Sequence, residues 1–118
     1  MNDKDTNITP EASKYGTPLP VQHALRKLGK DIQTARRRRR LPTKLVAERA
    51  GISRPTLLKL EQGHPGVSMG TCTSVLFALG ILERLDVLAD ASRDLVGMAL
   101  EEEHLPKRIH STVHSNRV

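Results

Sequence analysis

The side chains in this sequence that are best suited to chemistry are arginines, and five of them are consecutive, from Arg36 to Arg40. A guanidinium is planar and permanently charged, and it binds phosphate or the edge of guanine through paired N–H donors. Residues 18–66 carry 12 basic and 3 acidic side chains, a sum of +9, whereas residues 67–105 carry 2 basic and 7 acidic ones, a sum of −5. This separation predicts that nucleic acid binds to the first half of the chain.

The arginine run ends a predicted helix that begins near residue 20 and stops near residue 41. Apolar side chains recur along it at 21, 24, 25, 28, 32 and 35, which is helical spacing. A helix turns about 100° per residue, so five consecutive arginines cannot share one face. If Leu28 and Ile32 mark the buried face, Arg39 points toward the core and Arg36 lies beside it. The five arginines therefore cannot share one function.

Further helices are predicted from apolar spacing, glycines and capping residues. The second runs from Pro42 to Gly51, and the third begins after the cap Ser53 and ends at Gly63. The inner face of a fourth, between Ser68 and Gly80, consists of Met69, Cys72, Val75, Leu76 and Leu79. A fifth is predicted at about 82–89, and a short one after Ser92 has an apolar stripe of Leu95, Met98 and Ala99. No alternating pattern predicts a strand, so the fold class is all-α.

The link between the second and third helices is the most specific feature of the chain. The segment "TKLVAERAGISRPTLLKLEQG", residues 43–63, places a short glycine-containing turn between two helices. This is the arrangement of a helix-turn-helix. Ala47 is small where the two helices must cross closely, and Gly51 suits the turn. The apolar residues that lock the pair are Val46, Ala50, Ile52, Leu57 and Leu60.

This segment resembles the phage-repressor type of helix-turn-helix, the Xre/Cro-like family of five-helix DNA-binding modules. The resemblance covers about residues 28–82, and "AERAGISRPTLLKLEQG" carries most of it. It implies that the third helix lies in the major groove of double-stranded operator DNA. The expected organisation is a disordered tail at 1–17, a repressor-like domain at 18–90, and a helical or extended C-terminal extension at 91–118.

The resemblance assigns roles to residues on the second and third helices. Arg54 and Thr56 are the expected base readers, and Lys59 reaches a base or a phosphate. The expected phosphate contacts here are Thr43, Lys44 and Ser53. Family members often carry glutamine at the position of Thr43, where it touches both a phosphate and a base-reading side chain. Threonine is expected to be too short for both, which leaves more of the base contact to Arg54.

The resemblance also divides the arginine run. It implies an ion pair between Arg36 and Glu61 of the third helix. Arg39 is expected at the helix end, with its aliphatic stem over the core and its guanidinium in solvent. The candidates that remain for phosphate contact are Arg37, Arg38 and Arg40. The alternative is that these three form a solvated face that only raises the local potential.

Relatives bind inverted half-sites as dimers, so a homodimer is expected. The fourth and fifth helices carry apolar residues for this contact, or else to complete the core of the monomer: Leu76, Leu79, Ile81, Leu82, Leu85 and Leu88. Residues 88–110 resemble, less specifically, the ends of HipB-type antitoxins, which are encoded beside a HipA-like serine/threonine kinase toxin. This implies a repressor that is the antitoxin of a type II toxin-antitoxin system, autoregulates its operon and neutralises the toxin.

Two alternatives remain open. One is a stand-alone phage-type repressor with no toxin partner, and the other is a basic DNA-associated interaction module without operator specificity. A footprint on the chain's own promoter separates the repressors from the interaction module. The gene beside it in the operon separates the two repressors.

Other chemistry is not expected. The sequence contains no phosphate loop or nucleophile motif, so we expect neither an enzyme nor a cofactor or small-molecule ligand. His104, His110 and His114 could be considered as metal ligands, but His110 and His114 lie in the expected tail with no cysteine or carboxylate at ligand spacing, so no metal is expected. Cys72 is the only cysteine and is interpreted as a core residue. Without a disulfide or an apolar run of about 20 residues, the chain is expected to be cytoplasmic, with no membrane partner.

Overall fold

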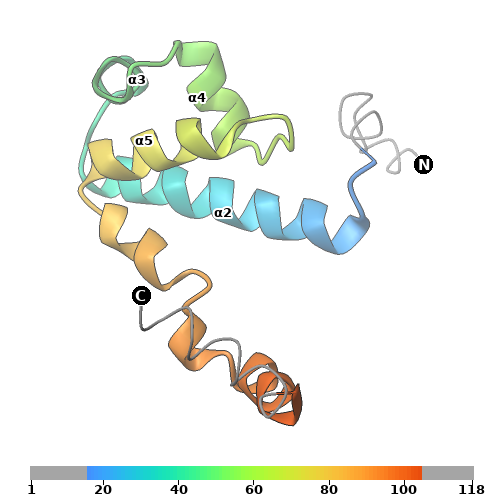
Figure 1. The fold of residues 1–118 in the computed structure, drawn as a ribbon. Helices are drawn as coiled ribbons and strands as arrows, with labels where there is room; N and C mark the ends of the chain where they lie inside the picture. Colours follow the sequence, from blue (N-terminus) through green and yellow to red (C-terminus); the bar gives the residue numbers. More distant parts are fainter. Residues whose placement is uncertain (1–15, 105–118) are drawn as a thin grey trace. The chain divides into compact units, whose positions relative to one another are not determined.

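The computed structural model describes residues 16–104, and these form helices with no strand. The α-helices are α2 (Leu19–Arg38), α3 (Thr43–Ala50), α4 (Arg54–Glu61) and α5 (Met69–Leu79), followed by the 3₁₀-helices η2 (Leu82–Val87) and η3 (Ala91–Arg93). A last helix covers 95–104 (Figure 1). The predicted all-α class is confirmed for the described residues. Most of the predicted N-terminal tail and of the C-terminal tail, with His110 and His114, lies outside them.

The chain divides into two compact units, one ending at Leu82 and the other beginning at Glu83. In the first unit α5 runs beside α2, while α3 and α4 complete the helical cluster (Figure 1). α5 packs against α3 and α2, and α4 packs against α2 and α3. The core between these helices is entirely aliphatic: Ile32, Val46, Ala47, Leu57, Leu60, Val75, Leu76, Leu79 and Ile81.

The buried face of α2 differs from the predicted one. Leu28 is 39% exposed, and the residues that α2 buries are Gln22, Gly29, Ile32 and Arg36. The reason is a close approach at Gly29, where an added Cβ would lie 2.6 Å from the backbone oxygen of Leu60 and 2.5 Å from that of Glu61. Because Gly29 has no side chain, the backbone of α4 packs directly on α2 there. This contact turns Gly29 toward the core and leaves Leu28 at the edge.

The predicted caps define the ends of the short helices. Ser53 Oγ accepts a hydrogen bond from the Thr56 backbone N–H at 3.2 Å and caps α4. Ser68 caps α5 in the same way, with 3.0 Å to the Thr71 N–H. Gly51 ends α3 in the left-handed conformation, with φ of 71°. Side-chain oxygens that accept from orphan N–H groups, and glycines that tolerate positive φ, are the usual reasons why helices begin and end.

The predicted fifth helix is present at 82–87, but it is the 3₁₀-helix η2 rather than an α-helix. Its leucines recur every three residues, at 82, 85 and 88, which fits three residues per turn better than 3.6. Leu88 N–H donates to the Leu85 carbonyl at 3.1 Å, a bond between residues three apart. The later helix begins after Asp94 rather than Ser92, since Asp94 Oδ1 accepts from the Gly97 N–H at 3.0 Å.

Candidate nucleic-acid interface

α3 and α4 form a rigid pair joined by residues 51–53. Ile52 N–H donates to the Ala47 carbonyl at 3.0 Å, which ties the turn back onto α3. Val46 and Leu57 are fully buried between the helices. The packing of the pair fixes the relative positions of the starts of α3 and α4. The predicted DNA contacts Thr43, Lys44, Arg54 and Thr56 lie there.

Arg54 and Thr43, the first residues of α4 and α3, are joined directly. Arg54 Nε donates to Thr43 Oγ1 at 3.0 Å, and the Arg54 side chain is otherwise exposed. Thr43 therefore reaches the side chain of the predicted base reader, because the long arginine spans the gap; whether Thr43 can also contact a phosphate stays a prediction. A hydroxyl that accepts one hydrogen bond keeps its own proton to donate elsewhere. The terminal amino groups of Arg54 have no partner within residues 16–104.

Two other hydroxyls of this surface bond each other. Ser53 Oγ and Thr56 Oγ1 share a hydrogen bond of 2.9 Å in addition to the cap on α4. Of the two predicted base readers, Arg54 therefore has uncommitted donors, whereas the Thr56 hydroxyl bonds Ser53. The predicted phosphate contact Ser53 likewise uses its oxygen to cap the helix.

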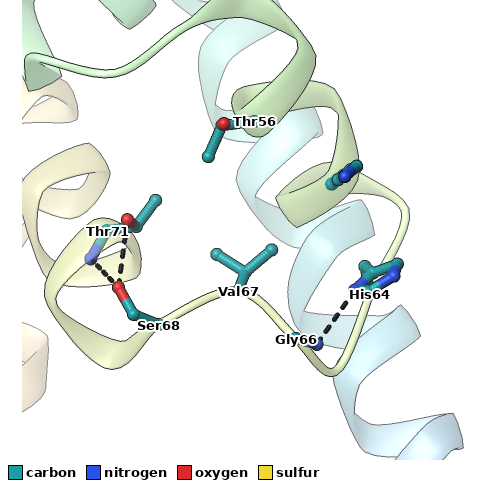
Figure 2. Close-up of a pocket in the computed structure, with 7 residues that line it drawn as sticks. Thr56, His64, Gly66, Val67, Ser68 and Thr71 are labelled. Atoms are coloured by element: carbon teal, nitrogen blue, oxygen red, sulfur yellow. Dashed lines mark hydrogen bonds between the residues drawn. The ribbon is translucent and has the colours of Figure 1, made fainter. Parts of the chain in front are cut away.

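A hollow of about 320 Å³ separates the start of α4 from the start of α5. Figure 2 shows Val67 projecting into it from the connecting loop, with Thr56 on the opposite side. His64 Nδ1 accepts from the Gly66 N–H at 2.9 Å and shapes this loop. The remaining lining residues are Lys59, Ser68 and Thr71. Lys59 is exposed, as is Lys44 on α3, so both lysines are accessible to a phosphate.

The predicted ion pair between Arg36 and Glu61 is present and buried. Arg36 Nε lies 2.7 Å from Glu61 Oε2, and Nη2 donates to Oε1 at 3.0 Å. The two side chains are 9% and 1% exposed. Arg36 Nη1 also donates to the Leu41 carbonyl at 3.1 Å. The hydrogen bonds to Glu61 raise the pKa of the Arg36 guanidinium. This arginine joins the end of α2 to both α4 and the following loop.

The other arginines of the run are all exposed. Arg39 lies at the helix end, as predicted: it is the C-terminal cap residue of α2 and is exposed. Its Nη1 folds back and donates to the Ala35 carbonyl at 3.0 Å. Arg37, Arg38 and Arg40 make no side-chain hydrogen bond or ion pair within residues 16–104.

Three of the residues predicted to form a dimer contact complete the monomer core instead. Leu76, Leu79 and Ile81 are 9%, 4% and 7% exposed and pack with the aliphatic core of the first unit. They are buried because α5 lies on α3 and α2. Leu82 and Leu85 are half-buried, and Leu88 is 67% exposed. Of the six residues predicted for the dimer contact, Leu88 is therefore the most exposed.

No protein-family model and no curated protein matches the chain. Within residues 16–104, no helix is long and apolar enough to cross a membrane.

Proposed function

We propose that this chain is a sequence-specific DNA-binding transcriptional repressor of the five-helix, repressor-like helix-turn-helix type. α3 and α4 are the helix-turn-helix pair, and α4 lies in the major groove with its N-terminal end toward the bases. The single observation that carries the proposal is the hydrogen bond from Arg54 to Thr43. It places an exposed arginine, with its terminal donors uncommitted, at the first turn of the helix that the sequence resemblance assigns to recognition.

The geometry of Arg54 suits the reading of guanine. Thr43 holds the guanidinium at Nε, so the two terminal nitrogens remain for the O6 and N7 acceptors of guanine in the major groove. A bidentate contact of this kind contributes about 1–3 kcal/mol of discrimination against other bases. The operator is therefore expected to contain a G·C pair at the position that Arg54 reaches in each half-site.

Charge supports a DNA-binding first unit. Residues 16–82 carry 12 basic and 3 acidic side chains, and residues 83–104 carry 2 basic and 7 acidic ones, so the sign of the charge changes at the boundary between the units. Lys44 and Lys59 are exposed on the helices next to Arg54. Thr43 keeps a hydroxyl proton for a phosphate oxygen.

We further propose that the repressor is the dimeric antitoxin of a HipA-like kinase toxin. The support is the resemblance of residues 88–110, together with apolar side chains that the second unit leaves exposed: Val87, Leu88, Leu95, Val96, Met98 and Leu100. Scattered apolar residues on a surface are ordinary, but six within 14 residues favour a protein partner. Dimerisation supplies the second half-site contact that operator specificity needs.

The test is a nuclease footprint on the promoter of the chain's own gene, followed by gel-shift competition. The wild-type protein should protect a symmetric site well above its non-specific background. Arg54→Ala should lower the ratio of specific to non-specific affinity at least about fivefold, the lower end of a bidentate contact, while salt-sensitive residual binding persists. Arg49→Ala is the matched control, since Arg49 is exposed in the last turn of α3. Binding without a protected site would support the non-specific module instead.

The antitoxin assignment has its own test. The adjacent gene should encode a HipA-like kinase, and the kinase should co-purify with this chain and lose activity in the complex. If no such gene lies beside it, the stand-alone repressor is the better description, and the footprint result is unaffected.

A further inference from the structure

We propose that Arg40 is a phosphate-binding residue whose side chain anchors the DNA backbone close to the start of α3. Its strained backbone conformation is retained because of this contact, and the inference rests on the proposed function. Among residues 16–104, Arg40 is the one non-glycine residue with positive φ, at 54°. In this left-handed region the Cβ of an L-residue crowds the following carbonyl oxygen. Such residues persist where the surrounding structure enforces them, and they concentrate at functional sites.

The position of Arg40 is one that helices usually fill with glycine. Arg40 N–H donates to the Arg37 carbonyl at 2.9 Å, and Leu41 N–H donates to the Arg36 carbonyl at 3.1 Å. These two bonds are the Schellman arrangement that ends a helix, with Arg40 at its left-handed position. The helices α3 and α5 also end with a residue in the left-handed conformation, and in both cases that residue is a glycine, Gly51 and Gly80.

The buried ion pair holds this turn in place. Arg36 Nη1 donates to the Leu41 carbonyl at 3.1 Å, while its Nε and Nη2 bond Glu61 of α4. The residue after Arg40 is therefore tied to the helix that carries Arg54. Glycine would form the same turn with less strain, so the turn alone does not account for an arginine at this position.

The surroundings of Arg40 identify the ligand. Its side chain is exposed and makes no hydrogen bond or ion pair within residues 16–104. Thr43, which bonds Arg54, is three residues further on, so the Cα atoms of Arg40 and Thr43 lie within about 11 Å of each other. At the edge of the proposed DNA-binding surface, the group that an uncommitted guanidinium meets is a backbone phosphate. Arg37 and Arg38 strengthen the local positive potential.

The test measures thermal unfolding and the salt dependence of DNA binding on the full chain. Arg40→Gly should raise the midpoint of unfolding by about 4–8 °C, because it removes the conformational cost of a left-handed arginine. The same variant should reduce the slope of log K against log salt by about 0.9 for each bound copy, which corresponds to one lost phosphate contact. Greater stability combined with weaker binding is the signature of a residue retained for function.

Two variants separate the side chain from the backbone. Arg40→Lys keeps the charge and the strained conformation, so both the unfolding midpoint and the salt slope should stay close to wild type. Lys30→Gln removes one charge at an exposed position of α2 outside the turn and should change the slope by less than half as much as Arg40→Gly.

The proposal is overturned if Arg40→Gly leaves the slope unchanged or changes it no more than Lys30→Gln does. It is also overturned if Arg40→Gly lowers the unfolding midpoint, because arginine would then be the residue that the turn requires. Failure of the proposed function would be detected by a different experiment, the nuclease footprint, in which the wild-type chain would protect no site on its promoter. The salt slope can still be measured on non-specific DNA in that case.

Discussion

At the scale of single residues, arginines of similar chemistry have different tasks because their environments differ. Arg36 is buried and bonds both oxygens of Glu61, whereas Arg37 and Arg38, on the same helix, are exposed. Removing one member of a buried pair leaves the other charge in a poorly solvated site, and this costs more than the pair contributes. Arg54 has its Nε bonded and its other donors directed to no protein group of the described chain. The partner decides the role of each arginine.

We predict that Arg36→Met destabilises the fold by about 3–5 kcal/mol, because it leaves the Glu61 carboxylate buried without a counter-charge. The double variant Arg36→Met/Glu61→Leu should recover most of this loss. Urea denaturation measures both. Lys27→Met is the comparison, since Lys27 pairs with Asp31 on the surface at 75% and 59% exposure, and it should cost less than about 1 kcal/mol. A double variant as unstable as Arg36→Met would contradict the unpaired-charge explanation.

We also predict that Thr43→Val weakens base discrimination without unfolding the domain, because valine keeps the shape of threonine but cannot accept from Arg54 Nε. Competition between the operator and a version with the guanine replaced by adenine should show a several-fold smaller preference for guanine. Thr43→Ser should restore the preference. If Thr43→Val selects guanine as well as wild type while Arg54→Ala does not, Thr43 has no role in positioning Arg54.

At the scale of helices, a glycine allows a close backbone contact in the first unit. The backbone of α4 meets α2 at Gly29, and no substituent fits between them. The caps at Ser53 and Ser68 define where α4 and α5 begin, but they do not determine which face of α2 is buried. That face follows from the approach of the two helices.

Gly29→Ala should therefore destabilise the domain by several kcal/mol, because its methyl group would meet backbone carbonyl oxygens that cannot move independently of α4. Gly70→Ala is the matched control: Gly70 is also helical, and the nearest atom to an added Cβ is Ser68 Oγ at 3.8 Å. It should be neutral or should stabilise the chain by up to about 1 kcal/mol. Thermal unfolding distinguishes the two, and equal midpoints would show that α2 and α4 separate without cost.

At the scale of the whole molecule, the net charge of the described residues changes sign between the two units. The first unit, to Leu82, contains the core and most of the basic side chains, and the second contains most of the acidic side chains of the described residues. Both units expose large apolar side chains, such as Phe77 in the first and Leu88 in the second. Since Leu76, Leu79 and Ile81 are already buried in the first unit, the proposed dimer contact moves to Leu88 and its neighbours.

Leu88→Glu should convert the proposed dimer to a monomer and lower operator affinity, while circular dichroism remains that of the wild type. Leu88 is 67% exposed, so the substitution disturbs no core packing. Val96→Glu, at 73% exposure in the later helix, is the control that should remain dimeric. Sedimentation measures the oligomeric state, and an unchanged association constant for Leu88→Glu would place the dimer contact elsewhere.

The sequence by itself determined what depends on near neighbours. The all-α class and the ends of α3, α4 and α5 follow from serine caps, glycines and apolar spacing within a few residues, and these predictions agree with the structure. The partner of Arg36 was also predicted, through a family resemblance. Only the tertiary structure decided which face of α2 is buried, whether Leu76 faces the core or a partner, and that Thr43 holds Arg54. These features depend on how closely helices that are distant in the sequence approach each other. The spacing of residues along the chain does not specify that distance.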